Sequence, residues 1–339
     1  SYMLPAFFIH ETMNNHSFVC YSIYMLDTIS EKTIFHIPLE SLYKNPGTMR
    51  LLEEASRSLG EVNNFASGAI EYDFVVEALK NIESLTSARI EGTTGNLKDL
   101  YAEEALTYAE KKQLKLFSAI NYKSTMNEIV DILQKYPNIN LAFIRHLHKI
   151  LTENDPATYG VPGELRNEEV VIANSTLGTF YPAHYLKVHD YMEQFVAERK
   201  KRKTIPVLLS AAIGHYQFES IHPFRDGNGR TGRILIVTDL IQGGTLKFPV
   251  LNLSQYFEMH RDDYLDALRS VSENGSYETW ATFFLEGVRE QSIRNLALIR
   301  ELRLIEEKDA KKINANFHSP AAALLLRHAL NKLFITVST

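Results

Sequence analysis

The sequence is poor in the residue that forms disulfides and many zinc sites. It contains one cysteine, Cys20, so neither an intramolecular disulfide nor a cysteine-ligated zinc site can form. Long apolar runs are also missing, and none approaches the roughly 20 residues that a membrane-spanning helix needs. The first residues lack the basic-then-apolar pattern of a secretory signal. We therefore expect a cytoplasmic protein with no membrane partner.

An excess of basic charge is missing as well. Acidic residues outnumber basic ones by 41 to 36, and the net charge of −5 does not favour nucleic acid as a partner. The basic run at residues 199–203 is better explained as a solvated helix end that complements the helix dipole. The length of 339 residues suits one large domain or two ordinary ones, and the composition is that of a globular protein.

Helical periodicity dominates the chain after residue 45. Apolar residues recur at three- and four-residue spacing over residues 48–60, 72–90, 97–120, 126–135, 141–151 and 184–199. Weaker patterns at residues 18–26 and 33–37 predict short strands. Two strand-like segments, residues 170–172 and 179–181, flank a turn and predict a β-hairpin. The fold class that we expect is mainly α with one small hairpin.

The most informative stretch is Ile-His-Pro-Phe-Arg-Asp-Gly-Asn-Gly-Arg-Thr-Gly-Arg at residues 221–233. It separates two apolar runs, residues 207–213 and 234–241, which predict buried helices. Gly227 and Gly229 permit positive φ, so backbone N–H groups can turn towards one point. The second helix is expected to begin near Gly229, where its unpaired N–H groups and its dipole attract an anion.

Charged side chains in the same stretch point to phosphate chemistry. Arg230 and Arg233 are three residues apart and share a helix face, so they predict a phosphate-binding helix end. Asp226 would repel phosphate unless a divalent metal bridged the two. His222 is the group suited to accept a proton near neutral pH. A helix cap followed by an ordinary arginine pair is the simpler alternative, but it explains neither Asp226 nor His222.

Every specified position from His222 to Arg233 matches the Fic-domain signature, His-Pro-Phe-x-(Asp/Glu)-Gly-Asn-Gly-Arg-x-x-Arg, and the sequence resembles that family. The resemblance implies a transferase that moves AMP from ATP to a protein hydroxyl, a reaction called AMPylation. It implies His222 as the general base and Asp226 as the Mg²⁺ ligand. The residues that it implies for ATP are Gly227, Asn228, Gly229, Arg230, Thr231, Gly232 and Arg233.

A second motif lies far upstream, where Ser87 is followed by Glu91 and Gly92. It resembles the inhibitory Fic pattern (Ser/Thr)-x-x-x-Glu-(Gly/Asn), found in Fic proteins with an N-terminal inhibitory helix. The resemblance implies that Glu91 pairs with Arg233 and withholds it from the γ-phosphate of ATP. A solvated glutamate at a helix end is the alternative.

The resemblance assigns further roles around the core. The hairpin would be the flap that aligns the target and borders the nucleotide, through Leu177, Gly178, Thr179 and Phe180. The Gly-Glu-Leu-Arg stretch at residues 163–166 matches a Gly-x-x-Arg segment of the family. Tyr264 is the candidate for the adenine pocket, with a core tyrosine as the alternative.

The resemblance covers roughly residues 45–290. We expect an N-terminal segment (residues 1–45), an N-terminal helical region with the inhibitory motif (46–120), a Fic core (121–290) and a C-terminal helical tail (291–339) that resembles the start of a winged helix. The expected partner is a target protein with an exposed Ser, Thr or Tyr hydroxyl, and a homodimer is left open. Two alternatives remain: a nucleotide-sensing module with little turnover, and a Fic enzyme that removes AMP or uses another phosphate-containing donor.

Overall fold

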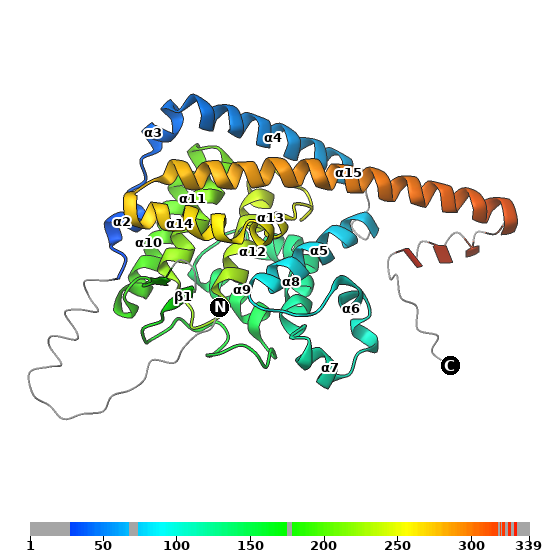
Figure 1. Cartoon of the computed structure of the whole chain (residues 1–339), viewed down its shortest axis with the longest axis horizontal. Helices are drawn as coiled ribbons and strands as arrows, with labels where there is room; N and C mark the ends of the chain where they lie inside the picture. The colour runs from blue at the N-terminus through cyan, green and yellow to red at the C-terminus, as the bar shows by residue number, and fades with distance from the viewer. Residues whose placement is uncertain are drawn as a thin grey trace, which may run out of the picture.

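The computed structural model describes residues 28–67, 74–174, 178–317, 319, 321–322, 325–326 and 329–330. Within these ranges the chain folds into α-helices with a two-stranded antiparallel hairpin (Figure 1). The mainly α fold expected from the sequence is confirmed. The strand predicted at residues 18–26 lies outside the described residues, as does most of the C-terminal tail after residue 317.

Most elements follow one another with short connections, but a longer segment at residues 153–171 joins α9 to β1. The N-terminal half contains α2 (Glu31–Phe35), α3 (Leu39–Lys44), α4 (Pro46–Ser67), α5 (Phe74–Ile90), α6 (Leu97–Tyr101), η1 (Glu103–Ala105), α7 (Tyr108–Gln113), α8 (Phe117–Lys135) and α9 (Leu141–Thr152). The hairpin, β1 (Ile172–Asn174) and β2 (Gly178–Phe180), comes next. The remaining elements are η2 (Tyr185–Lys187), α10 (Val188–Lys201), η3 (Arg202–Thr204), α11 (Val207–Ile221), α12 (Asn228–Gln242), α13 (Leu253–Met259), α14 (Arg261–Asn274) and α15 (Tyr277–Phe317).

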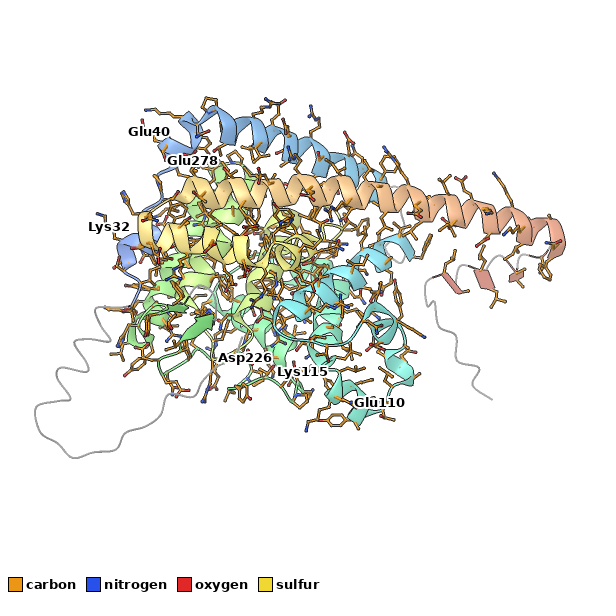
Figure 2. All side chains as sticks on the ribbon, viewed as in Figure 1. Lys32, Glu40, Glu110, Lys115, Asp226 and Glu278 are labelled. Carbon is orange, nitrogen blue, oxygen red and sulfur yellow. The ribbon has the colours of Figure 1, made fainter. Side chains whose placement is uncertain are left out.

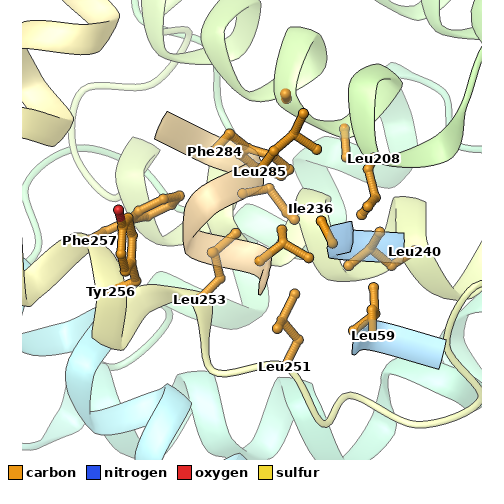
Figure 3. Close-up of a cluster of buried hydrophobic side chains, with 14 of the residues drawn as sticks. Leu59, Leu208, Ile236, Leu240, Leu251, Leu253, Tyr256, Phe257, Phe284 and Leu285 are labelled. Carbon is orange, nitrogen blue, oxygen red and sulfur yellow. The ribbon is translucent and has the colours of Figure 1, made fainter. Parts of the chain in front are cut away.

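Two long helices, α4 and α15, lie side by side along one edge of the molecule (Figure 1). They close over α11, α12 and α13 through a large apolar cluster. Figure 3 shows Leu59 from α4, Leu240 from α12 and Leu285 from α15 converging in this cluster. On α15, the side chains of Trp280, Phe283, Phe284 and Val288 are all buried. Among the described residues, no helix combines the length and the apolar content needed to cross a bilayer.

The central pair of helices, α11 and α12, is buried on nearly every side. A helix that is apolar all round belongs in a core, which is why the two runs flanking the motif predicted buried helices. A second apolar cluster packs α8, α9 and α10 against the other side of this pair, through residues such as Phe218, Phe224 and Ile234. The loop between α11 and α12 is therefore fixed between two cores.

The helix α5 carries the second motif towards the start of α12. Leu85 and Ala88 on α5 join Leu100, Leu116 and Ala119 in a small third cluster. The helix predicted at residues 97–120 is broken into α6, η1, α7 and the first turn of α8. Capping boxes at Asn96 and Thr107 start new helices there, and the predicted core position Tyr108 is exposed instead.

Two local predictions are wrong, the second of them only in part. Residues 33–37 were expected to form a strand, but they lie in and after α2, whose first turn Ser30 caps through the N–H of Thr33. The basic run ends α10 as expected, with Lys200 and Lys201 exposed, but Arg202 is buried and the side chain of Arg199 is only 8% exposed. Arg199 pairs with an aspartate of α12, and Arg202 donates to a glutamine of α11 at 2.6 Å. Their partners lie 40 and 15 residues away, so only the tertiary fold supplies them.

Candidate active site

The site is built on the turn from α11 into α12, and His222 forms that turn. Its backbone is left-handed (φ 49°, ψ 62°), which is uncommon for a residue with a side chain. Arg166 holds this backbone in place. The side-chain Nε of Arg166 donates to the carbonyl of His222 at 2.8 Å, and its backbone N–H donates to the carbonyl of Pro223 at 2.9 Å. Nη2 of Arg166 also donates to the backbone carbonyls of Ile221 and Ala183. The arginine of the Gly-x-x-Arg segment therefore positions the histidine.

Phe224 anchors the loop from inside. Its ring is fully buried and stacks on His148 with centroids 3.7 Å apart. Asn228 then closes the loop, because its side-chain oxygen accepts from the N–H of Phe224 and its amide donates to the same residue's carbonyl, both at 2.8 Å. The Asn228 side chain is therefore occupied by the loop, and only its backbone N–H remains for a nucleotide.

Replacing Phe224 with alanine is expected to lower the free energy of unfolding by about 3–5 kcal/mol, because a fully buried aromatic ring leaves a cavity. Urea denaturation monitored by circular dichroism measures this change. The matched control is Tyr159→Ala, which removes a nearby aromatic ring that is 65% exposed and should change stability by less than about 0.5 kcal/mol. Equal effects of the two substitutions would contradict the anchoring role.

Asp226 is held by backbone groups on both sides. One carboxylate oxygen accepts from the N–H of Gly227 at 2.6 Å and the other from the N–H of Tyr159 at 3.1 Å. His148 accepts from the N–H of Gly163 at Nδ1, so its Nε2 carries the proton donated to the Asp226 carbonyl, 2.8 Å away. In Figure 2, Asp226 lies on the side of the molecule opposite α4 and α15.

The environment of Asp226 suits one bound cation. Burial raises the pKa of this carboxyl, although Arg230 and the two N–H groups oppose the effect. A divalent cation would compensate the buried charge. No group of three metal-ligating side chains occurs among the described residues, so the other ligands of such an ion would have to come from phosphate oxygens and water.

The first turn of α12 is shaped for the close approach of an anion. Gly227 precedes it with φ 76°, and a Cβ there would lie 2.7 Å from Thr152. A Cβ on Gly229 would lie 2.2 Å from Oε1 of Glu91, so this carboxylate rests directly against the turn. Because the N–H groups of a first turn and the helix dipole attract negative charge, Glu91 occupies the place that suits a phosphate.

The guanidinium of Arg233 is directed at the end of α5 and the turn that follows it. Its Nε donates to the hydroxyl of Ser87 at 2.8 Å, and its Nη2 donates to the Ser87 carbonyl at 3.0 Å and to Glu91 at 2.9 Å. Burial alone would raise the pKa of Glu91, but Arg233 outweighs burial and the pKa is lowered, so the pair is ionic. The contact between Glu91 and Arg233, which are 142 residues apart, is present as the sequence motif implied.

The other arginine of the motif has a different set of partners. Arg230 is buried and donates to Asp155 at 3.2 Å, to the carbonyl of Leu151 at 3.3 Å and to the hydroxyl of Thr158 at 3.3 Å. The prediction that both guanidiniums face the phosphates is therefore not met in this conformation. Asp155 also accepts from Ser118 on α8, so the buried pair ties α12 to the loop after α9.

Two more residues predicted to bind ATP face the interior instead. Thr231 is fully buried, and its hydroxyl donates back to the carbonyl of Gly227 at 2.9 Å. A Cβ on Gly232 would lie 2.4 Å from a carboxylate oxygen of Glu219, so this glycine allows α11 and α12 to approach. Both residues shape the site without offering a side chain to it.

Tyr264 is a core tyrosine. It is 4% exposed, stacks on Phe257 with centroids 4.5 Å apart, and shares a 2.8 Å hydrogen bond with Nε2 of His215. This packing matches the alternative given above and does not present the ring to an open adenine pocket. The sequence departs from the double tyrosine of the family here, since Leu265 follows Tyr264.

The charge of Glu91 reaches several of these groups at once. Burial lowers the pKa of His222 to about 3 and raises that of Asp226, and in both cases the charge of Glu91 adds an upward push. Together with its pairing to Arg233, this places Glu91 among the residues of the main motif.

Two residues of the site, Asp155 and Glu219, were not identified from the sequence. Helical spacing puts Glu219 on the same face as His222, so the sequence could have predicted that the two are neighbours. No pattern in the sequence around Asp155 indicates that it belongs to the site.

The predicted hairpin is confirmed, with a shifted first strand. Ile172 pairs with Phe180 and Asn174 with Gly178, so β1 begins two residues later than expected. Thr179 and Phe180 lie on β2, while Leu177 falls outside the described residues.

Comparison with known proteins places the chain among Fic proteins. Family models described as Fic/DOC family N-terminal and Fic/DOC family match residues 49–131 and 138–240. A probable protein adenylyltransferase of Aquifex aeolicus is 31% identical over 165 residues, which is 48% of each chain. A protein adenylyltransferase Fic of Aedes aegypti is 30% identical over 159 residues, 43% of this chain and 30% of its own. These alignments therefore span about half or less of the relatives.

A solved structure has the same fold. The crystal structure of a Fic family protein from Desulfovibrio desulfuricans aligns with a TM-score of 0.65 and 18% identity, over 75% of each chain.

Proposed function

The chain belongs to the Fic/DOC family, and we propose that it is a protein adenylyltransferase that moves AMP from ATP to a Ser, Thr or Tyr hydroxyl of a target protein. The observation that carries the proposal is the meeting of His222, Asp226 and Arg233 around the first turn of α12, where Glu91 rests as a bound carboxylate. The names of the curated relatives support the same activity.

The roles follow from the position of each group. His222 takes the proton of the target hydroxyl, whose oxygen attacks the α-phosphorus of ATP. The bond from the α-phosphorus to the bridging oxygen breaks, and pyrophosphate leaves. The N–H groups of the first turn of α12 and the guanidinium of Arg233 stabilise its negative charge. Asp226 would hold Mg²⁺, which when bound neutralises the phosphate oxygens.

We also propose that Glu91 inhibits the transferase activity of its own chain by holding Arg233. Nε and Nη2 of Arg233 already donate hydrogen bonds to Ser87 and Glu91, so the guanidinium cannot bind the γ-phosphate in this conformation. The hairpin would present the target by pairing with an extended segment of it, as in other β-augmentation complexes. The target is then a protein with an exposed hydroxyl residue.

A test with two labels identifies the reaction. Self-modification or target modification should incorporate label from α-labelled ATP and none from γ-labelled ATP, since AMP transfer releases the β- and γ-phosphates. The Glu91–Arg233 contact favours one alternative, a nucleotide-sensing module with little turnover. That module would bind both labels reversibly and retain neither after denaturation. Incorporation from γ-labelled ATP would overturn the proposal in favour of phosphate transfer.

Asp226→Ala should weaken nucleotide binding only when Mg²⁺ is present, because its carboxylate is unfavourable beside phosphates without a cation. In a Glu91→Gly background we expect a loss of about tenfold in affinity with Mg²⁺, or roughly 1.4 kcal/mol, and little change in chelator. Calorimetric titration with ATP measures both. An equal loss under the two conditions would assign Asp226 to capping the loop through Tyr159 and Gly227 instead.

A further inference from the structure

An acidic side chain of α11, that of Glu219, lies beside His222. Glu219 lies one turn earlier, and its Oε2 is 3.9 Å from Nδ1 of His222. The two side chains are 14% and 10% exposed. Oε1 of Glu219 is buried without a hydrogen-bond partner, and Nδ1 of His222 has no partner in good geometry, since its one backbone contact is with Glu219 itself. Buried polar atoms are nearly always paired, so this juxtaposition calls for a physical explanation.

The packing of α12 makes room for this carboxyl. Gly232 is the residue opposite Glu219, and a Cβ there would lie 2.4 Å from Oε1 of Glu219 and 3.2 Å from the ring of His215. A larger residue at position 232 would displace Glu219 from His222. The close approach of the two helices therefore holds an acidic side chain beside the catalytic histidine, where an apolar side chain would cost less to bury.

The charges that face this pair come from several other parts of the fold. Burial raises the pKa of Glu219 to about 8; Arg233 on α12 lowers it and Glu91, in the turn after α5, raises it. Burial also lowers the pKa of His222, with the charge of Arg166 in the same direction. His215 on α11 and Tyr264 on α14 complete the surroundings. Glu219 is thus poised to ionise close to neutral pH, while His222 stays uncharged until it receives a proton.

We propose that Glu219 is the positioning residue for His222, and this inference rests on the transferase function proposed above. The carboxylate of Glu219 accepts a hydrogen bond from the Nδ1–H of His222. The neutral ring then has its unprotonated nitrogen at Nε2, directed at the target hydroxyl. When the hydroxyl proton passes to Nε2, the oxygen bonds to the α-phosphorus and pyrophosphate leaves with the electrons of the broken bond. Glu219 keeps no proton in this step and stabilises the imidazolium. The 3.9 Å separation is one that catalytic hydrogen bonds commonly shorten when substrate binds.

The kinetic test uses Glu219→Gln in the Glu91→Gly background, with self-modification by α-labelled ATP as the readout. Glutamine keeps the shape beside Gly232 but cannot carry the charge. We expect a rate about ten- to a hundredfold lower at pH 8.5 with an unchanged ATP dissociation constant. The parent should show a rate that rises with pH as Glu219 ionises, at a pH below about 8 because the charge of Glu91 is gone. The glutamine variant should lack this rise.

Glu83→Gln is the matched control. Glu83 is more deeply buried than Glu219, and burial raises its pKa to about 7, but it bonds to Ser254 and Tyr122 away from His222. This variant should keep the rise of rate with pH. If Glu219→Gln keeps the parent's rate and profile, or if Glu83→Gln loses the rise equally, the assignment is overturned.

A second readout does not need activity. Nitrogen NMR of the histidine rings reports which nitrogen of His222 is protonated, with His222→Ala to identify its signals. Ionisation of Glu219 should shift the Nδ1 signal of His222 between pH 6 and 9, and Glu219→Gln should abolish the shift. An unchanged Nδ1 signal in both chains would overturn the inference. Absence of label transfer by the Glu91→Gly parent would instead overturn the proposed function and leave this measurement standing.

Discussion

Replacing Glu91 with glycine should raise self-modification with α-labelled ATP by about a hundredfold. The carboxylate rests on the first turn of α12 and holds Arg233, so it competes with the phosphates for both of their binding groups. ATP that enters beside it would be displaced, and a misplacement of about 1 Å can cost roughly a hundredfold in rate. Glycine at position 91 removes the competitor and keeps the side chains of His222 and Asp226 in place. Initial rates of label incorporation measure the gain.

Two further variants separate the causes of this gain. Glu91→Gln keeps the shape of the side chain but removes its charge, so its rate should fall between the parent and the glycine variant. Adding Arg233→Ala to Glu91→Gly should erase most of the gain, because the freed arginine would bind the γ-phosphate. Arg233 is buried while the side chain of Glu91 is 31% exposed, and a buried charge that loses its partner destabilises the fold, so each variant also needs a thermal denaturation control. A glycine variant no faster than the parent would reduce Glu91 to a glutamate at a helix end.

Local patterns predicted the parts of the site that are contiguous in the chain. Apolar runs on both sides of residues 221–233 located α11 and α12, and the glycines located the turn between them. The fully buried Phe224 follows from one apolar residue in a polar loop. The pairing of Glu91 with Arg233 came from the resemblance of the upstream motif, since spacing alone cannot connect residues 142 apart.

The errors have a common physical origin, which is a partner supplied by the tertiary fold. Arg230 was assigned to phosphate because it shares a helix face with Arg233, but in this conformation Asp155 binds it from 75 residues away. Arg199 in the basic run was assigned to a solvated helix end that complements the dipole, but Asp239 binds it. Tyr264 is surrounded by aromatic side chains of α13 and α15 that the sequence does not place. A charge or ring without a nearby partner in sequence is therefore weak grounds for a ligand contact.

His222→Ala in the Glu91→Gly background should lower transfer by about a hundred- to ten-thousandfold while ATP binding stays nearly intact. The loop does not depend on the imidazole, because Arg166 holds the backbone carbonyl and Phe224 and Asn228 close the turn. Burial lowers the pKa of His222 to about 3, so the ring is unprotonated and able to accept a proton across the range from pH 6 to 9.

The left-handed backbone at position 222 requires its own control, since alanine adopts φ 49° less readily than asparagine does. His222→Asn keeps that backbone preference and provides no comparable base. If lost base catalysis is the cause, both variants should be equally slow and both should bind ATP in calorimetric titration. If strain in the turn is the cause, asparagine should recover the rate and alanine should also lose ATP affinity. Transfer within a few-fold of the Glu91→Gly parent in either variant would remove His222 from the chemistry and move the search for the base to the target itself.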